Sequence, residues 1–178
     1  MDNIVRQALA KWPDVPDCYG WLGLDARGNW YMRDERAQAG GPFSGGTVQS
    51  KGALLKHEKL IGFIGRNYQP DAQGQWFFQN GPQRVYVELE VTALIWRIDH
   101  DLSVQDHIGR AAVVKGCVLD EQGRLYLDTD IGFGLIHSMD MGHAANAVER
   151  SVWWPQPVLE ADLSACFSYV TSPLARRL

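Results

Sequence analysis

The sequence has few cysteines and no long apolar run. Its 178 residues include three cysteines, Cys18, Cys117 and Cys166, which cannot all pair within one chain and form no Cys-x-x-Cys motif, so we expect no disulfide framework. No stretch approaches the roughly 18 apolar residues of a membrane span. The segment Met1–Trp12 lacks the apolar core of a secretory signal peptide. We therefore expect a cytoplasmic protein whose thiols stay reduced and which has no membrane partner.

An excess of basic residues is also missing. Lys and Arg number 17 against 21 Asp and Glu, which gives a formal net charge of −4 at pH 7. Phosphate backbones attract a basic surface, so we do not expect nucleic acid as a partner. The glycine-rich segments miss the spacings of nucleotide-binding loops: residues 40–47 contain no Gly-x-x-x-x-Gly-Lys-Ser/Thr, and Gly132-Phe133-Gly134 is not followed by a third glycine. We therefore expect no cofactor.

One short pattern occurs three times in the chain. It has the form Asp-x-x-Gly-x-apolar-aromatic-apolar, and its copies begin at Asp25, Asp71 and Asp120. Aspartate favours the first position of a type I turn, and glycine three residues later readily adopts a positive φ. Because strand-forming residues flank each copy, we interpret all three as tips of β-hairpins. A Ca²⁺ loop is the alternative, but no copy has oxygen ligands at alternate positions and a downstream Glu.

Between the repeats, apolar periodicity indicates helices and one long strand. Helical spacing occurs in Asp2–Trp12, Gly52–Gly65 and Met141–Glu149. Apolar residues alternate with polar ones from Val85 to Val91, which is typical of a strand with one buried face. Residues 36–46 contain two Gly-Gly pairs and predict a mobile loop.

These elements predict an α+β fold. We expect antiparallel β-hairpin repeats that form a small roll or barrel-like sheet, with two or three helices packed on it. Residues 1–178 would form one compact unit or two small lobes. In the second case, residues 1–70 would hold the N-terminal helix, a hairpin and a helix, and residues 71–178 a β-rich lobe with the C-terminal helix.

Several stretches, taken in order, form a pattern known from a bacterial family. They are Ala53–Ile64, Asp71–Phe78, Pro82, Val85–Trp96 and Leu125–Phe133. In this respect the chain resembles domain-of-unknown-function family 1285, or a sister of it, over residues 18–137. The chain departs from that family at Pro82-Gln83-Arg84, where the family has Pro-Val-Glu-Lys, and at Phe133, where the family has an acidic residue. The resemblance implies a repeat-containing, β-rich fold and a regulatory or signalling role, and it brings no established reaction.

Two histidines and an aspartate form the strongest candidate for a ligand site. His137, Asp140 and His143 follow an apolar stretch and open the predicted helix over 141–149. A helix N-terminus favours anions, and Asp140 could orient either imidazole. The alternative is that Asp140 caps the helix and His143 faces solvent. A second polar cluster, Asp99-His100-Asp101 with Asp106-His107, is interpreted as a turn between strands, with a metal site as its alternative.

Tryptophan is abundant, with seven residues in the chain. Four of them are expected to form the core under the hairpins: Trp21, Trp30, Trp76 and Trp96. Trp153 and Trp154 are adjacent, so both cannot face inward in a simple strand or helix. One of these two is a candidate anchor for a partner chain; the alternative is that they cover the last hairpin.

No complete catalytic constellation occurs in the sequence. We therefore expect a non-catalytic module that binds a small molecule or a protein, forms a homodimer and has a regulatory or signalling role. The alternative is a metal-dependent, hydrolase-like enzyme that uses His137, Asp140 and His143.

Overall fold

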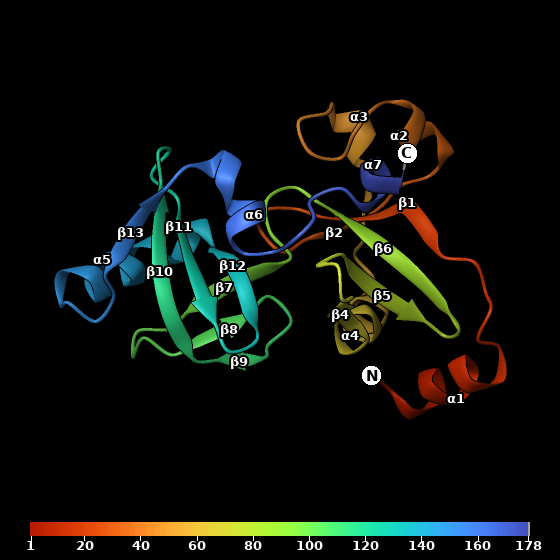
Figure 1. Ribbon diagram of the computed structural model, residues 1–178, viewed down its shortest axis with the longest axis horizontal. Coiled ribbons are helices and arrows are strands. Elements are labelled where there is room, and N and C mark those ends of the chain that lie inside the picture. Colours follow the sequence, from red (N-terminus) through yellow and green to blue (C-terminus); the bar gives the residue numbers. More distant parts are fainter. Residues whose placement is uncertain (178) are drawn as a thin grey trace. The chain divides into compact units, whose positions relative to one another are not determined.

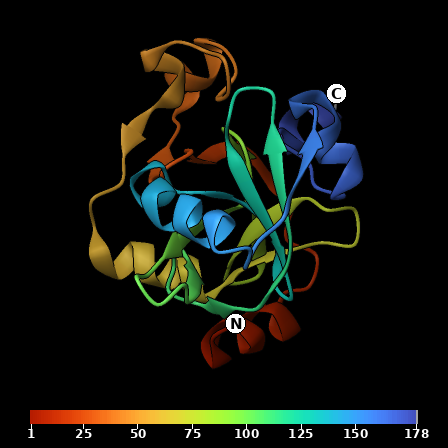
Figure 2. The same cartoon turned by 90° about the vertical axis from the view of Figure 1, so that its left-hand side faces the viewer.

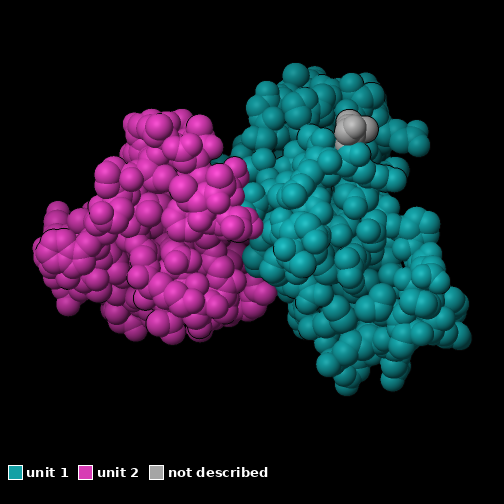
Figure 3. Space-filling model, in the orientation of Figure 1, with its two compact units in different colours: residues 1–25, 29–91, 169–178 teal, residues 26–28, 92–168 magenta. Residues whose placement is uncertain are grey.

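The computed structural model describes residues 1–177, which form two curled mixed sheets and seven α-helices. This confirms the predicted α+β class. The chain folds into two compact units, coloured separately in Figure 3. Unit 1 comprises residues 1–25, 29–91 and 169 onward, and unit 2 comprises residues 26–28 and 92–168. The predicted division into lobes at residue 70 stays a prediction. None of the helices in residues 1–177 has the length and apolar character needed to span a membrane.

The sheet of unit 1 has six strands in the order β3-β2-β1-β6-β5-β4 (Figure 1). Their bounds are β1 Cys18–Leu24, β2 Trp30–Met32, β3 Ala53–Leu54, β4 Tyr68–Pro70, β5 Trp76–Asn80 and β6 Gln83–Leu89. The central pair, β1 and β6, is parallel, and all the other neighbours are antiparallel. The sheet therefore consists of two antiparallel meanders, β1–β2–β3 and β4–β5–β6, which are joined by the parallel pairing of β1 with β6.

Five helices belong to unit 1: α1 Asn3–Lys11, α2 Glu35–Ala39, α3 Val48–Lys51, α4 Glu58–Arg66 and α7 Pro173–Arg177. The prediction of a helix over Gly52–Gly65 is wrong at its start. Ala53 and Leu54 instead pair with β2 as strand β3, and the side chain of His57 caps α4 by accepting the Leu60 N–H at 3.3 Å. Backbone pairing and a cap therefore outweigh the apolar periodicity in this segment.

The chain returns to unit 1 at its C-terminal end. The Thr171 carbonyl accepts the Leu89 N–H at 2.8 Å, next to the end of β6. The buried carboxylate of Glu88 accepts the hydroxyl of Ser172 at 2.5 Å and the N–H of Leu174 at 3.0 Å. The negative charge of Glu88 is thus held at the start of α7, where backbone N–H groups lack helical partners.

The sheet of unit 2 has seven strands in the order β13-β10-β11-β12-β7-β8-β9. Their bounds are β7 Leu94–Ile98, β8 Val104–Asp106, β9 Ala111–Ala112, β10 Val114–Asp120, β11 Leu125–Thr129, β12 Gly132–Ile136 and β13 Pro155–Val158. The parallel pairs are β7 with β12 and β10 with β13. Figure 2 faces this unit and shows the tall β10–β11 hairpin with β13 beside it. Unit 2 also holds α5 Met141–Glu149, which has the predicted bounds, and α6 Leu163–Cys166.

The two sheets share one strand order. If β7 to β12 are matched with β1 to β6, the order β9-β8-β7-β12-β11-β10 repeats β3-β2-β1-β6-β5-β4, and the parallel pair falls at the same place. Unit 2 adds only β13 at one edge. The short repeat in the sequence therefore accompanies a strand order that occurs twice in the structure.

The repeated Asp-x-x-Gly segments form hairpin tips, as predicted. The glycines at positions 28, 74 and 123 have φ values of 80°, 78° and 79°. At the tip of β10–β11, the Asp120 carboxylate accepts backbone N–H groups from Gln122 and Arg124, and its second oxygen accepts the Arg124 Nε–H at 2.6 Å. The residue after the glycine thus returns its side chain to the aspartate.

Unit 2 contains two further tight turns that the sequence pattern does not include, and one of them has the same side-chain bonds. Asp106 to Arg110, between β8 and β9, makes the same set of bonds, including Arg110 Nε–H to Asp106 Oδ2 at 2.6 Å. Between β7 and β8, Leu102 stands in the glycine position with φ of 66°. The polar clusters at residues 99–101 and 106–107 are therefore turns between strands, as interpreted from the sequence.

Each unit has its own aromatic core. In unit 1, Trp30 contacts Tyr68, which in turn contacts Trp76, at ring-centroid distances of 5.0 and 4.7 Å. In unit 2, Trp96 is fully buried and donates its Nε1–H to the Leu127 carbonyl at 3.1 Å. The predicted core position of Trp21 is wrong, because 40% of this residue is exposed.

Candidate ligand-binding site

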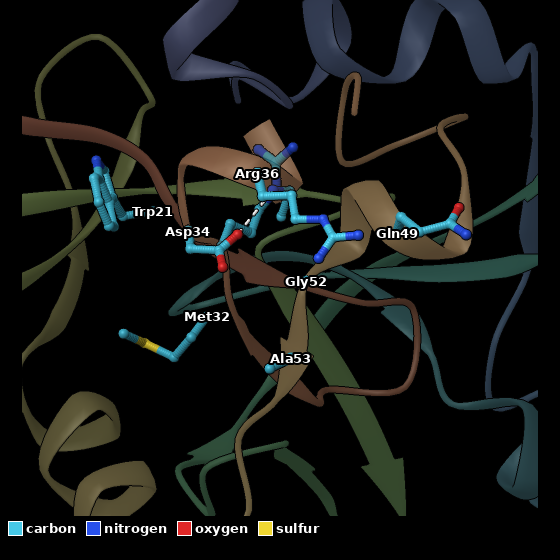
Figure 4. Close-up of a pocket in the computed structure, with 9 residues that line it drawn as sticks. Trp21, Met32, Asp34, Arg36, Gln49, Gly52 and Ala53 are labelled. Carbon is cyan, nitrogen blue, oxygen red and sulfur yellow. Dashed lines mark hydrogen bonds between the residues drawn. The ribbon is translucent and has the colours of Figure 1, made fainter. Parts of the chain in front are cut away.

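A cleft of about 400 Å³ lies in unit 1, where the β2–β3 connection leaves the sheet. We call it the Arg36 cleft. Its walls come from the strand residues Trp21 and Met32, from the start of α2 and from the end of α3. In Figure 4, Arg36 lies between Trp21 on one side and Gln49 on the other. The cleft is thus built largely from residues 33–52, which separate β2 from β3.

Short-range bonds fix the walls of the cleft. Asp34 begins α2 because its Oδ1 accepts the Ala37 N–H at 2.8 Å, the dashed line in Figure 4. Thr47 begins α3 in the same way, by accepting the Ser50 N–H at 3.2 Å. After α3, Gly52 has φ of 84°, and a Cβ there would lie 2.3 Å from the Met32 carbonyl oxygen. Only glycine lets the chain turn this closely back onto β2.

The loop before α3 is also anchored, contrary to the predicted mobile segment 36–46. Phe43 is 1% exposed, and its ring fills the space where Gly23 has no side chain. Ser50 donates its hydroxyl to the Pro42 carbonyl at 2.8 Å. The buried ring of Phe43 and the buried hydroxyl of Ser50 therefore anchor a segment that its glycines had predicted to be mobile.

One of the residues that line the cleft carries a buried positive charge. Arg33 is 2% exposed, and its guanidinium donates to the carbonyls of Ser50, Gly41 and Gly20 at 2.8, 2.7 and 3.3 Å. Burial lowers the pKa of Arg33, and the more distant charge of Glu88 opposes that effect. Within residues 1–177, Arg33 forms no ion pair. Carbonyl dipoles therefore stabilise this cation where a carboxylate would be expected.

A second cation stands at the rim. The exposed side chains of Arg36 and Gln49 make no hydrogen bond or ion pair with any described residue. Of the charged residues that line the cleft, Arg33 and Arg36 are positive and Asp34 is negative. Formal charge in the cleft is therefore +1, and two side chains with free N–H donors face solvent. Such a site favours an anionic group.

An apolar cavity of about 340 Å³ lies next to this cleft in the same unit. We call it the α4 cavity, because Leu60 and Ile64 of α4 form one wall and Leu22, Phe78 and Val85 of the sheet form another. Trp21 and Met32 line both hollows. No charged side chain lines the α4 cavity.

The described lining of the Arg36 cleft offers groups that recognise a ligand. Asp34 is its only carboxylate, and one oxygen of that group already caps α2. No histidine, cysteine, serine or lysine lines the cleft. The arrangement offers positive charge, one amide and an aromatic ring, which are recognition groups.

The sequence-predicted cluster His137, Asp140 and His143 lies in unit 2. The Asp140 carboxylate accepts the Arg97 Nε–H at 2.6 Å and the Ile98 N–H at 3.1 Å. Burial acts to raise the pKa of Asp140, but the hydrogen bonds from Arg97 and Ile98 outweigh it, so the pKa lies below its usual range.

The two histidines have different surroundings. His137 is buried, and its Nδ1 accepts the Met139 N–H at 3.1 Å, while His143 is exposed on α5. In the described part of the chain, no group of three or more His, Cys, Asp or Glu residues is arranged to hold a metal ion. A ligand-binding role for the three residues stays a prediction.

The two adjacent tryptophans differ in burial. Trp153 is 7% exposed and Trp154 is 67% exposed. Both line a hollow of about 300 Å³ beside β10, together with Val152 and Cys117. Burial raises the pKa of Cys117 to about 11, so its thiol stays protonated at neutral pH. The role of Trp153 and Trp154 in partner binding stays a prediction.

The chain is an α+β protein with a duplicated strand order, and comparison with known proteins places it in a family. It belongs to the family DUF2944, described as "Protein of unknown function (DUF2946)", which it matches over residues 1–174. Among solved structures it is similar to a DUF1285 family protein from Silicibacter pomeroyi DSS-3, with 11% sequence identity and a TM-score of 0.50. That similarity covers 82% of this chain and 84% of the other.

At 11% identity the likeness concerns the fold. It confirms the resemblance to family 1285 that the sequence suggested, although the matching family is a different one. Comparison with curated proteins found no match.

Proposed function

We propose that the protein is a non-catalytic binding module that holds a small organic anion in the Arg36 cleft. One observation carries the proposal: the buried Arg33, which has no ion pair in residues 1–177, lines the same cleft as Arg36, whose side chain has no partner there. A buried cation favours an anion nearby, because it removes part of the cost of burying the charge. We further propose that the module acts in the cytoplasm, in a regulatory or signalling role.

The test is a titration with small anions of matched shape. Sodium benzoate is added to ¹⁵N-labelled protein, and benzyl alcohol serves as the neutral analogue. We expect benzoate, and not the alcohol, to shift the indole N–H resonance of Trp21. The variant Arg36→Gln should weaken benzoate binding about tenfold or more, because hydrogen bonds to charged groups contribute about 1.5–3 kcal/mol.

The matched control is Arg6→Gln, on the exposed side of α1 and absent from the cleft lining. Its affinity for benzoate should equal that of the wild type. Equal weakening in both variants would mean that benzoate responds only to net charge, and the proposal would fail.

A second candidate is binding of a protein partner, or of a second copy of the chain, through Trp154. The supporting observation is the 67% exposure of this large aromatic residue next to Val152, which is 49% exposed. Trp anchors contribute strongly to interfaces. Light scattering at increasing concentration would reveal a dimer, and Trp154→Ala should shift it to monomer.

The alternative of a metal-dependent hydrolase keeps His137, Asp140 and His143 as its site. Such a site would require Asp140 to release Arg97 and the Ile98 N–H. Elemental analysis of the purified protein tests it: stoichiometric Zn, Fe or Mn, lost in a His137→Ala, His143→Ala double variant, would favour the enzyme.

A further inference from the structure

The two hollows of unit 1 adjoin each other. Trp21 and Met32 line both the Arg36 cleft and the α4 cavity, and these side chains are 40% and 45% exposed. In Figure 4, the thioether of Met32 extends away from Arg36, toward the side on which α4 lies. Methionine is unbranched and adapts its shape easily. A flexible partition of two apolar side chains therefore separates the cleft from the cavity.

The two hollows differ sharply in chemistry. Arg33, Arg36 and Asp34 line the cleft, whereas the α4 cavity has no charged lining residue. The polar lining groups of the cavity are Asn80 and Gln83, and the Gln83 amide already donates to the Pro16 carbonyl at 2.9 Å. Together the hollows have a charged end and a hydrocarbon end.

The α4 cavity is half-open to solvent, and most of its lining is apolar. An apolar group that enters it removes that lining from water, which is favourable. The cleft carries a formal charge of +1 from Arg33, Arg36 and Asp34, which matches a monoanion better than a doubly charged phosphate.

We infer that the ligand of unit 1 is a medium-chain monocarboxylate, with its carboxylate at Arg36 and its hydrocarbon chain in the α4 cavity. The inference rests on the proposed function, since it assigns the anionic group to the same cleft. It adds the chemical class of the ligand and its orientation, with the carboxylate in the cleft and the hydrocarbon chain in the cavity. Met32 and Trp21 enclose the first methylenes, and Leu60 and Ile64 contact the end of the chain.

Calorimetric titration with butanoate, hexanoate, octanoate and decanoate, each below its micelle concentration, tests the inference. Each added methylene should raise the affinity about fourfold until the cavity is full, as expected from the burial of one CH₂ group. Arg36→Gln should lower the affinity by the same factor at every chain length. Octanol and octylamine should bind at least tenfold more weakly than octanoate.

The variant Leu60→Trp fills the cavity from α4. It should abolish the dependence on chain length and leave butanoate binding unchanged. If its thermal melt shows that it does not fold, Asn80→Trp, at an exposed position that lines the α4 cavity and not the Arg36 cleft, fills the cavity from β5 and should have the same effect. Ile4→Trp on α1, where the residue is 71% exposed, is the control and should keep the full dependence.

The outcomes separate the two proposals. If butanoate binds through Arg36 and affinity does not rise with chain length, this inference is overturned and the proposed function stands. If no carboxylate binds, both fail. Octyl phosphate binding more tightly than octanoate would overturn the assignment of the carboxylate head group.

Discussion

Units 1 and 2 share the order of six strands and the position of a parallel pair, but they place their additional segments differently. Unit 1 inserts residues 33–52 between β2 and β3, and α4 between β3 and β4, whereas residues 107–110 alone connect β8 to β9. Unit 2 adds α5, β13 and α6 after its last shared strand. The cavities of each unit lie against these additions. A common scaffold thus supports sites that the additional segments create.

The units also differ in the chemistry of their turns. At the tip of β4–β5, the side chain that returns to the aspartate is the neutral amide of Gln75, at 3.0 Å from Asp71 Oδ2. At the matching tip of β10–β11 it is the guanidinium of Arg124, at 2.6 Å from Asp120 Oδ2. The aspartate of this turn therefore has a neutral partner in unit 1 and a charged partner in unit 2.

The largest expected effect is the loss of stability when the core of unit 2 is disrupted. Trp96→Ala removes a fully buried ring from unit 2 and should lower the free energy of unfolding by about 3–5 kcal/mol. Urea denaturation measures the loss, and hydrogen exchange should locate it first in residues 92–168. Trp12→Ala, at a residue 52% exposed, is the matched control and should change stability by no more than about 0.5 kcal/mol. Equal losses would contradict the assignment of Trp96 to the core.

The paired turns should respond unequally to the same change. Asp120→Asn places an amide N–H opposite the Arg124 guanidinium and should cost about 1.5–3 kcal/mol, because hydrogen bonds to charged groups are lost. Asp71→Asn, where the partner is neutral, should cost about 0.5–1.5 kcal/mol. Urea midpoints of both variants measure the difference. A cost that is as large at Asp71 as at Asp120 would show that the ion pair adds nothing to the turn.

Acid should act on unit 2 through Asp120 and Asp140. Burial opposes ionisation of both, but their hydrogen bonds outweigh it and lower both pKa values. A lowered native pKa contributes stability above the unfolded value of about 3.9, and this contribution is lost as the pH falls through the native pKa. The stability gap between wild type and Asp120→Asn should therefore narrow below about pH 4. Urea midpoints at pH 6, 4 and 3 measure it, and a constant gap would contradict the ion-pair explanation.

The smallest effects on stability are expected at the turn position whose residue has a positive φ. Gly123 has φ of 79°, and an added Cβ would meet no atom within 4 Å, so Gly123→Ala should cost about 1 kcal/mol from the backbone alone. Leu102 occupies the corresponding position at φ of 66°. Leu102→Gly should stabilise by about 0.5 kcal/mol, since relief of about 1–2 kcal/mol is partly offset by the freedom of glycine in the unfolded chain. Thermal melts compare the two, and a loss of stability in Leu102→Gly would contradict this account.

The hairpin tips could be predicted because their chemistry is local. The aspartate, the glycine and the side chain that bonds back to the aspartate all lie within five consecutive residues, as in Asp120–Arg124. The copy at Asp106 does not match the pattern because Ala112 stands where the other copies have an aromatic residue. Its detectable signal was the hydrogen-bonding side chain after the glycine, which Arg110 shares with Arg124.

The Arg36 cleft could not be predicted, because its parts meet only through strand pairing. Trp21 and Met32 lie near each other since β1 pairs with β2 with Leu22 opposite Met32. Gly52 joins them because β3 pairs with β2. In the sequence, Arg33 looks like any charged residue after a strand, and only the folded loop reveals that three carbonyls surround it.

By itself, the sequence determined the α+β class, the repeated turns and the helices over 3–11 and 141–149, because each depends on contacts between near neighbours along the chain. Tertiary structure alone decided the parallel pairing at the centre of each sheet, the burial of Arg33 and the exposure of Trp21. These features depend on segments distant in the sequence. The favourable free energy of these contacts is gained only once the distant segments have folded against one another.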